Sequence, residues 1–203
     1  MWHGAWAALP LLASASAQIV GSLPDQNPRY FPVGVFASVK SDDGNFKARW
    51  YAEELRGLKE PSLSEPASSG ESIYRFTWLR TFHHPIVVRI AIHASGTGTL
   101  TVRMSDGAGG YAPGKLILNS AREISMTEVR HVLDTVDAMN FWQMPPSAGP
   151  LYLDGAEWMF EASVRDKYHV VDRQSPQDGP LRELGLYLVL TLGGLDVPAD
   201  TIY

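Results

Sequence analysis

A strict alternation of side chains between Ser72 and Phe82 constrains this chain more than any other part of its sequence. Successive side chains of a β-strand point to opposite faces, so the even-numbered residues here would share one face of a sheet. That face would carry Tyr74, Phe76, Trp78, Arg80 and Phe82. The stretch is therefore predicted to be a strand with one aromatic face, on which a core can form.

Five further segments are typical of strands and are separated by polar or glycine-rich turns. They are residues 86–93, 100–105, 115–123, 156–164 and 167–173. Arg165 and Asp166 form a short hairpin connection between the last two. Because short turns join strands that run antiparallel, these segments predict a largely antiparallel sheet.

Three segments have helical character instead. The first has an apolar stripe at i, i+4 and i+7, formed by Tyr51, Leu55 and Leu58. Ser125 and Glu128 match the capping box S-x-x-E, which opens a helix through about Met139. Residues 181–192 are strongly apolar and suit a helix buried against the sheet. The chain is thus predicted to be α+β, a largely antiparallel sheet with two or three helices packed on one face.

The composition narrows the classes of function. A length of 203 residues fits one domain. The formal net charge is −5 and the basic residues are scattered, whereas a nucleic-acid partner needs a clustered basic face. The absence of cysteine excludes disulfides, thiolate zinc sites and a cysteine nucleophile. We therefore expect no nucleic-acid partner, and no cofactor fingerprint is recognisable.

The first seventeen residues, MWHGAWAALPLLASASA, are typical of an export signal. An apolar run from Ala5 to Ala13 leads to an A-x-A cleavage pattern before Gln18, although no Lys or Arg precedes Arg29. The alternative is a buried N-terminal helix, which Pro10 fits poorly. Because the run is too short for a membrane span, we expect a periplasmic or secreted protein without stable membrane insertion. The predicted parts are a signal peptide at 1–17, an extended lead-in at 18–47, a single α+β domain at 48–193 and a flexible tail at 194–203.

Arg80 is the first candidate for a ligand site. A cation among aromatic side chains has to find a carboxylate, stack on a ring or sit beside a bound anion. The structural interpretation is an ion pair with Glu157, Glu161 or Asp172, covered by Trp78. This interpretation is favoured over an anion-binding site, because an unpaired buried charge is costly.

The histidines do not follow a metal-binding pattern. His83 and His84 are adjacent, so on a strand they would point to opposite faces, and Pro85 marks a strand end or a bulge. His93 and His169 stand apart, without H-x-H or H-E-x-x-H spacing. The sequence predicts no metal site, and leaves open whether these four histidines converge in the fold.

Catalytic motifs give weak signals. Residues 109–115 match G-x-x-x-x-G-K, but Leu116 follows where a phosphate-binding loop needs Ser or Thr, so a hairpin loop is predicted. No G-x-S-x-G nucleophile elbow is found. Glu157 and Glu161 share a strand face and could form a carboxylate pair for acid/base chemistry, although a solvated face is the commoner arrangement.

Four stretches carry a resemblance to a family of uncharacterised bacterial proteins, mostly predicted to be exported. They are WYAEELRGLKEPSL, YRFTWLRTFHHPIVVRI, DGAGGYAPG and DGAEWMFEASVRDKYHVVDRQSP. The resemblance spans about Trp50 to Leu192 and implies a common α+β domain. It implies no activity, cofactor or catalytic residue. One departure lies at Gln174, where the family leads us to expect an aromatic residue before Ser175.

Three hypotheses on function follow. The leading one is a non-enzymatic exported domain that binds a protein or a small molecule in the cell envelope, since catalytic, metal and cofactor motifs are missing and an open sheet face or edge suits binding. The competing one is a hydrolase-like enzyme for an anionic small substrate. In that case Arg80 would bind the anionic group, Glu161 or His169 would act as acid or base, and all three would line one pocket. The third is a subunit of an assembly.

Overall fold

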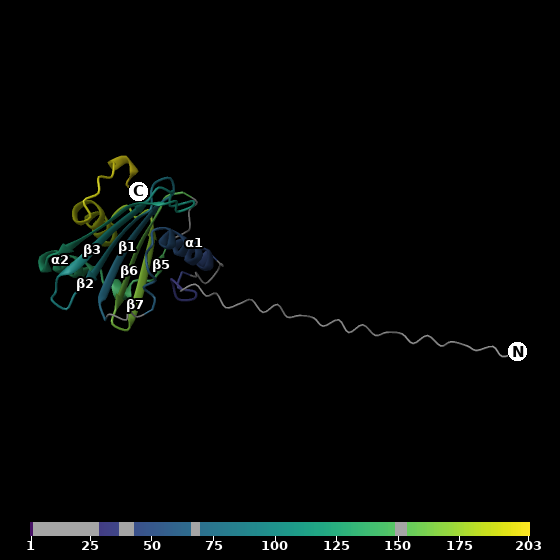
Figure 1. Cartoon of the computed structure of the whole chain (residues 1–203). Helices are drawn as coiled ribbons and strands as arrows, with labels where there is room; N and C mark the ends of the chain where they lie inside the picture. Colours follow the sequence, from purple (N-terminus) through teal and green to yellow (C-terminus); the bar gives the residue numbers. More distant parts are fainter. Residues whose placement is uncertain (2–28, 37–42, 66–69, 149–153) are drawn as a thin grey trace.

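The frame of the fold is a seven-stranded sheet, seen in a computed structural model that describes residues 1, 29–36, 43–65, 70–148 and 154–203 (Figure 1). Apart from Met1, the predicted signal peptide at 1–17 lies outside these residues, as does part of the expected lead-in at 18–47. None of the helices formed by the described residues combines the length and apolar character needed to cross a membrane.

The sheet is antiparallel except at one edge. Its strands are β1 (Ser72–Arg80), β2 (Ile86–Ile92), β3 (Gly98–Ser105), β4 (Leu116–Ile124), β5 (Ser147–Ala148), β6 (Ala156–Val164) and β7 (Lys167–Gln174). Their spatial order is β4-β3-β2-β1-β6-β7-β5, and β5 pairs parallel with β7. The first four strands form a meander, and the β6–β7 hairpin is added to the free side of β1. The prediction of a largely antiparallel sheet in an α+β fold is confirmed.

Helices cover both faces of this sheet. One face, which we call the α2 face, carries α2 (Met126–Ala138), α3 (Pro180–Leu186) and the π-helical turn η2 (Tyr187–Leu192) that continues α3. The opposite face, the α1 face, carries α1 (Asp43–Gly57). Two short 3-10 turns are η1 (Phe141–Gln143) and η3 (Ala199–Thr201). Two helices thus share a face as predicted, while the third lies on the other side of the sheet.

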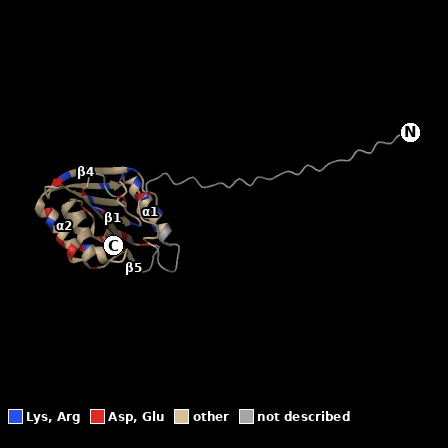
Figure 2. Ribbon diagram, turned by 90° about the horizontal axis from the view of Figure 1, so that it is seen from below, with Lys and Arg blue, Asp and Glu red and all other residues tan. Residues whose placement is uncertain are grey.

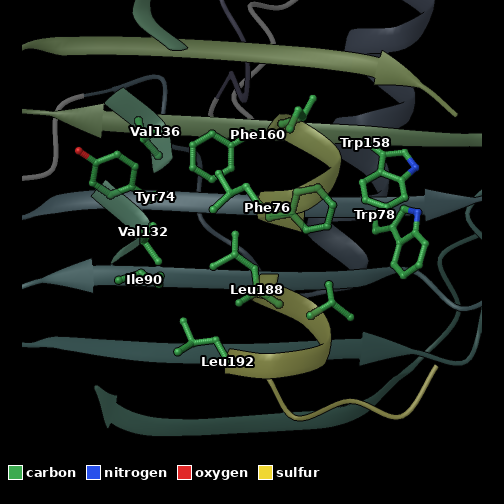
Figure 3. Packing of buried hydrophobic residues seen from close by; sticks show 14 of the residues in the cluster. Tyr74, Phe76, Trp78, Ile90, Val132, Val136, Trp158, Phe160, Leu188 and Leu192 are labelled. Atoms are coloured by element: carbon green, nitrogen blue, oxygen red, sulfur yellow. The ribbon is translucent and has the colours of Figure 1, made fainter. Parts of the chain in front are cut away.

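The larger core lies on the α2 face and is built on the predicted aromatic strand. Phe76 and Trp78 of β1 face Phe160 and Trp158 of β6 across the register, and all four are fully buried. Figure 3 shows these rings beneath α2 and η2, which contribute valine and leucine side chains. Burial of rings of this size supplies much of the hydrophobic stabilisation of a domain.

A second core lies on the α1 face because the strand residues that point to this side are buried as well, which are the odd-numbered ones on β1, β2 and β6 and the even-numbered ones on β7. Tyr51, Leu55 and Leu58 form the predicted stripe of the first helix and have no exposed surface. They pack with Leu79, Val87, Met159 and Val170 of the sheet and with Tyr30, Phe31 and Phe36 of the preceding segment. The strand β1 is therefore covered on both faces. The sequence does not indicate this, because the odd positions of β1 include polar residues.

The helix α2 begins where the sequence predicts. The Ser125 side chain accepts a hydrogen bond from the Glu128 backbone N–H, while the Glu128 side chain accepts one from the Ser125 backbone. This reciprocal capping satisfies two backbone donors that a helix start leaves free, so the predicted capping box is confirmed.

Figure 2 shows how the charged residues are distributed over the elements. Segments of Lys and Arg and segments of Asp and Glu are both scattered along the visible ribbon, so neither sign dominates this view. Several charged residues instead lie inside the molecule, at the centre of the sheet, and these decide where a functional site can be placed.

Candidate functional site

The candidate site lies at the end of β1, where Arg80 stacks on its aromatic neighbour. The guanidinium carbon is 4.3 Å from the centre of the Trp78 ring, and only 4% of the residue is exposed. Its Nη1 donates to the Thr201 hydroxyl oxygen at 3.0 Å and to the Thr201 carbonyl oxygen at 3.3 Å. Within the described part of the chain, Arg80 forms no ion pair.

The predicted ion pair of Arg80 with Glu157, Glu161 or Asp172 is therefore wrong. Arg80 faces Ala156 across the β1–β6 ladder, so Glu157 and Glu161 belong to the odd-numbered set that points to the α1 face. Asp172 faces Met159 across β6 and β7 and lies on that same side. The carboxylates and the guanidinium are thus separated by the thickness of the sheet.

Two tryptophans form the floor of the site. The Trp78 and Trp158 rings lie 4.8 Å apart, and the Arg182 guanidinium is 5.2 Å from the centre of the Trp158 ring. Figure 3 shows both indole nitrogens at the same end of the sheet. An aromatic floor with two cations is a surface that favours anionic or π-bonded groups.

The C-terminal segment closes the site from above. The indole Nε1 of Trp158 donates to the Tyr203 backbone oxygen at 2.9 Å, and the Tyr203 hydroxyl lies 2.9 Å from His83 Nδ1. Together with the Thr201 contacts of Arg80, these bonds hold η3 and the last residues against the sheet (Figure 1). Residues 194–203 are expected from the sequence to form a flexible tail, but Leu195, Val197, Ile202 and Tyr203 pack against the core, and these apolar side chains are the signal that could have indicated the contact.

Two donors beneath this segment remain without a partner. Arg80 Nε and Trp78 Nε1 are buried and have no hydrogen-bond acceptor among the described residues. Burial lowers the pKa of Arg80, an effect that Tyr203 opposes. Burial and the nearby Arg80 also lower the pKa of His83, which favours its neutral form. The site therefore offers positive charge and N–H donors, and an acceptor with negative charge would complement it.

The other two residues of the enzyme hypothesis lie elsewhere. Glu161 is fully buried on the α1 face, where its carboxylate accepts from Arg75 Nε at 2.8 Å, Arg75 Nη2 at 2.9 Å and the Tyr168 hydroxyl at 2.8 Å. Burial raises the pKa of Glu161, while Arg75 opposes this. A carboxylate bound on both oxygens and sealed from solvent is a structural group in this fold.

His169 shares the α2 face with Arg80 but lies far along it. His169 faces Ala162 on β6, six positions from Ala156, which faces Arg80; this corresponds to about 20 Å at the usual strand rise. Its Nε2 lies 3.0 Å from the Met144 carbonyl oxygen, and its ring packs on Phe141 at 4.8 Å. Burial lowers its pKa. Arg80, Glu161 and His169 therefore do not line one pocket.

A second set of charges holds α1 to the sheet. Lys47 Nζ lies 2.6 Å from Asp172 Oδ2 and 3.3 Å from Glu157 Oε2, and the Tyr51 hydroxyl donates to Asp172 at 2.9 Å. Burial raises the pKa of Glu157, an effect that Lys47 opposes. Glu157 and Glu161 form neither a carboxylate pair nor a solvated face: both are buried, Glu161 is paired with Arg75, and Glu157 shares Lys47 with Asp172. These residues form a buried cluster that fixes α1 to the sheet. The side chains in its two ion pairs are at most 10% exposed.

A third set fastens the segment after α1. Glu60 is 2% exposed and accepts from Arg89 at 2.9 Å and from Arg103 at 2.9 Å, while Arg75 lies 3.5 Å away. Three guanidinium groups around one carboxylate have no vacant position for a ligand. Arg75, Arg89 and Arg103 are thus structural, and none of them was predicted as a site residue. The signal that could have identified them is that each occupies an alternate position of a strand.

The remaining sequence candidates have structural partners. His83 contacts Tyr203, whereas His84 Nδ1 lies 2.9 Å from the Gly107 carbonyl oxygen. His93 contacts Thr99 at the other end of β2, so the four histidines do not converge. Among the described residues, no three His, Asp or Glu side chains are placed to hold a metal ion. The G-x-x-x-x-G-K stretch is a loop between β3 and β4, as predicted.

Neither protein-family models nor curated proteins give a match to this chain.

Proposed function

We propose that this chain is a non-enzymatic binding domain that takes an anionic group at the Arg80 site. The observation that carries the proposal is a buried cation whose described hydrogen-bond acceptors belong to a neutral residue, Thr201. Two buried donors beside it, Arg80 Nε and Trp78 Nε1, lack an acceptor among the described residues. A carboxylate or phosphate would supply both the charge and the acceptors.

Binding is favoured over hydrolysis by the surroundings of Arg80. A general acid or base has to reach the reacting atoms within hydrogen-bond distance, directly or through one water. Glu161 lies on the other face of the sheet and His169 lies about 20 Å along it, judged from strand rise. The two acid/base residues that the hydrolase hypothesis assigns are therefore not near Arg80, and the titratable histidine beside Arg80 is His83, which contacts Tyr203.

The C-terminal segment has a place in this function. Thr201 and Tyr203 occupy donors of the site with backbone and hydroxyl oxygens. An anion at Arg80 would add an ion pair that the uncharged oxygens of Thr201 cannot supply, and it would displace or rearrange the segment to reach the guanidinium.

Binding is tested by a thermal-shift screen and calorimetry on the purified chain with small carboxylates, inorganic phosphate and neutral sugars. The variant Arg80→Gln removes the cation, and Arg130→Gln removes an equal charge from the exposed surface of α2 as the matched control. A ligand at 100 times its Kd stabilises a protein by about 2.7 kcal/mol. We expect carboxylates or phosphate to stabilise the wild type and Arg130→Gln, and to have no effect on Arg80→Gln.

Equal stabilisation of all three proteins, or none of any, would contradict an anion site at Arg80. His169→Ala is included for the hydrolase hypothesis. That variant should bind like the wild type, and a loss of binding in it would revive the idea that His169 and Arg80 act together.

We also propose that the domain works in the cell envelope as a periplasmic or secreted protein. The proposal rests on the apolar segment and A-x-A pattern of residues 1–17 and on the resemblance to exported bacterial proteins. Mass spectrometry of the protein expressed in a bacterium should find an N-terminus at Gln18 in the periplasmic or secreted fraction. An intact N-terminus in the cytosolic fraction would overturn it.

A further inference from the structure

The C-terminal segment, residues 194–203, covers the Arg80 site but stays partly exposed along its whole length. Its apolar side chains contact the core, yet none of its residues is buried. It begins at Gly194, which has a φ of +65° and open space around it. Glycine adopts this conformation without strain, and hinges are built from a few such loop positions. A segment of this kind can leave the sheet without extracting a fully buried side chain.

Two donors of the sheet bind alternate backbone oxygens of this segment. Arg80 Nη1 donates to the Thr201 carbonyl oxygen at 3.3 Å, and Trp158 Nε1 donates to the Tyr203 backbone oxygen at 2.9 Å. Ile202 between them has an extended backbone, with φ −93° and ψ 95°. In an extended chain, residues two positions apart face the same side and are about 6.5–7 Å apart. The two donors thus match the repeat of a polypeptide, which a single carboxylate or phosphate group cannot span.

Two side chains of the segment fill further contacts of the site. The Thr201 hydroxyl oxygen accepts from Arg80 Nη1 at 3.0 Å. The Tyr203 ring packs edge-on against the His83 ring at 5.6 Å, and its hydroxyl lies 2.9 Å from His83 Nδ1. The site therefore holds a short polar side chain at one position and an aromatic side chain two residues later.

This segment leaves the charge of the site unmatched. Thr201 is neutral, and Asp200 before it is exposed and forms no ion pair with Arg80. Arg80 Nε and Trp78 Nε1 have no acceptor among the described residues. A carboxylate in place of the Thr201 hydroxyl would neutralise Arg80 and bring a second oxygen for the free donors. An acidic residue therefore complements this position better than threonine does.

We propose that the Arg80 site binds an extended peptide of a partner protein, with an acidic residue at the place of Thr201 and an aromatic residue two positions later. Residues 199–203 are then a neutral counterpart of this ligand, which occupies the site until the partner displaces it. The inference rests on the proposed function, since it takes the anion at Arg80 to be a side-chain carboxylate. It adds the class of the ligand and the sequence pattern that the site recognises.

Binding is tested on the full chain with labelled peptides of residues 195–203, amidated at the C-terminus, that carry either T201D or T201N. The two peptides have nearly the same shape and differ by one charge. By fluorescence anisotropy, we expect the T201D peptide to bind about tenfold more tightly or better, because only it forms a charge-assisted bond with the guanidinium. The preference should vanish in Arg80→Gln and persist in Arg130→Gln, which removes an exposed charge from α2.

The same substitutions in the chain itself test whether the segment competes with the peptide. Thr201→Asp places a carboxylate beside Arg80 within the molecule. It should raise the urea midpoint and weaken binding of the T201D peptide about tenfold or more, since the tethered group has a high effective concentration. Thr201→Asn is the matched control and should do neither. Amide hydrogen exchange of residues 199–203 should become faster when the T201D peptide binds, because the segment leaves the site.

The outcomes separate this inference from the proposed function. If small carboxylates bind in an Arg80-dependent way while the two peptides bind equally, the anion site stands and the peptide ligand is refuted. Tight binding of the T201D peptide with unchanged exchange at residues 199–203 would refute the displacement of the segment. If neither the small carboxylates nor the peptides depend on Arg80, the proposed function and this inference both fail.

Discussion

Glu54 offers the sharpest test of the energetics of this fold. The residue lies on α1, has no exposed surface, and neither carboxylate oxygen has a hydrogen-bond partner among the described residues. Burial raises its pKa from 4.5 to about 8, with a smaller contribution from Glu53. We therefore expect the neutral acid in the folded protein at pH 7 and the ionised form in the unfolded chain.

The magnitude follows from the two pKa values. The difference between 4.5 and about 8, at 1.36 kcal/mol per pKa unit, is about 5 kcal/mol of folding free energy. Both states are protonated below pH 4.5, where this contribution is fully present. As the pH rises to 8, the unfolded chain loses its proton while the folded chain keeps it, so stability falls by about 1.4 kcal/mol per pH unit and then levels off.

The test is urea unfolding of the wild type and Glu54→Gln between pH 5 and pH 9. Glutamine does not ionise, so the stability of the variant relative to the wild type should rise by about 4 kcal/mol between pH 5 and pH 9, since a small part of the effect is already lost at pH 5. Comparing the two proteins cancels the contributions of Glu157 and Glu161, which burial also raises. Glu53→Gln, an exposed neighbour, is the control and should run nearly parallel to the wild type. Parallel curves for Glu54→Gln would refute the reasoning.

Three further substitutions test the packing by urea unfolding at pH 7. Arg75→Met should cost about 3–5 kcal/mol, because it leaves Glu161 buried without its cation, and a loss below 1 kcal/mol would show that the pair is dispensable. Gly185→Ala should cost about 1–3 kcal/mol, since the new Cβ would lie 2.6 Å from the Phe76 ring; an unchanged midpoint would mean that the ring moves freely. Ser125→Ala should cost about 1 kcal/mol by removing the cap of α2, and no change in the midpoint would count against that role.

Most of the fold could be predicted from local patterns. The alternation from Ser72 and the capping box at Ser125 depend on neighbours in the sequence, and both are found in the structure. The side of the sheet on which α1 packs could not be read in this way. Arg75 and Thr77 make the odd face of β1 look half-polar, although both are buried.

The candidate site was predicted only in part. Arg80 was recognised because a cation on an aromatic strand face needs an explanation, and its stacking on Trp78 was among the possibilities. Its pairing could not be predicted, since it depends on Thr201, which is 121 positions away in the sequence. The strand register between β1 and β6 assigns Glu161 to the opposite face, and such a register is set by the whole sheet.

The pairing of β1 with β6 has a consequence for the order of folding. Ile73 faces Ser163, and ninety residues separate these positions, whereas β1 to β4 pair between neighbours in the sequence. During synthesis, the meander is complete before β6 exists, and one side of β1 has no strand beside it. Closing such a long loop is slow compared with forming local hairpins. We therefore expect the partly synthesised chain to expose one unpaired edge of β1, to which a chaperone that holds unfolded chains could bind. Stopped-flow refolding that finishes in one microsecond-scale phase would argue against this delay.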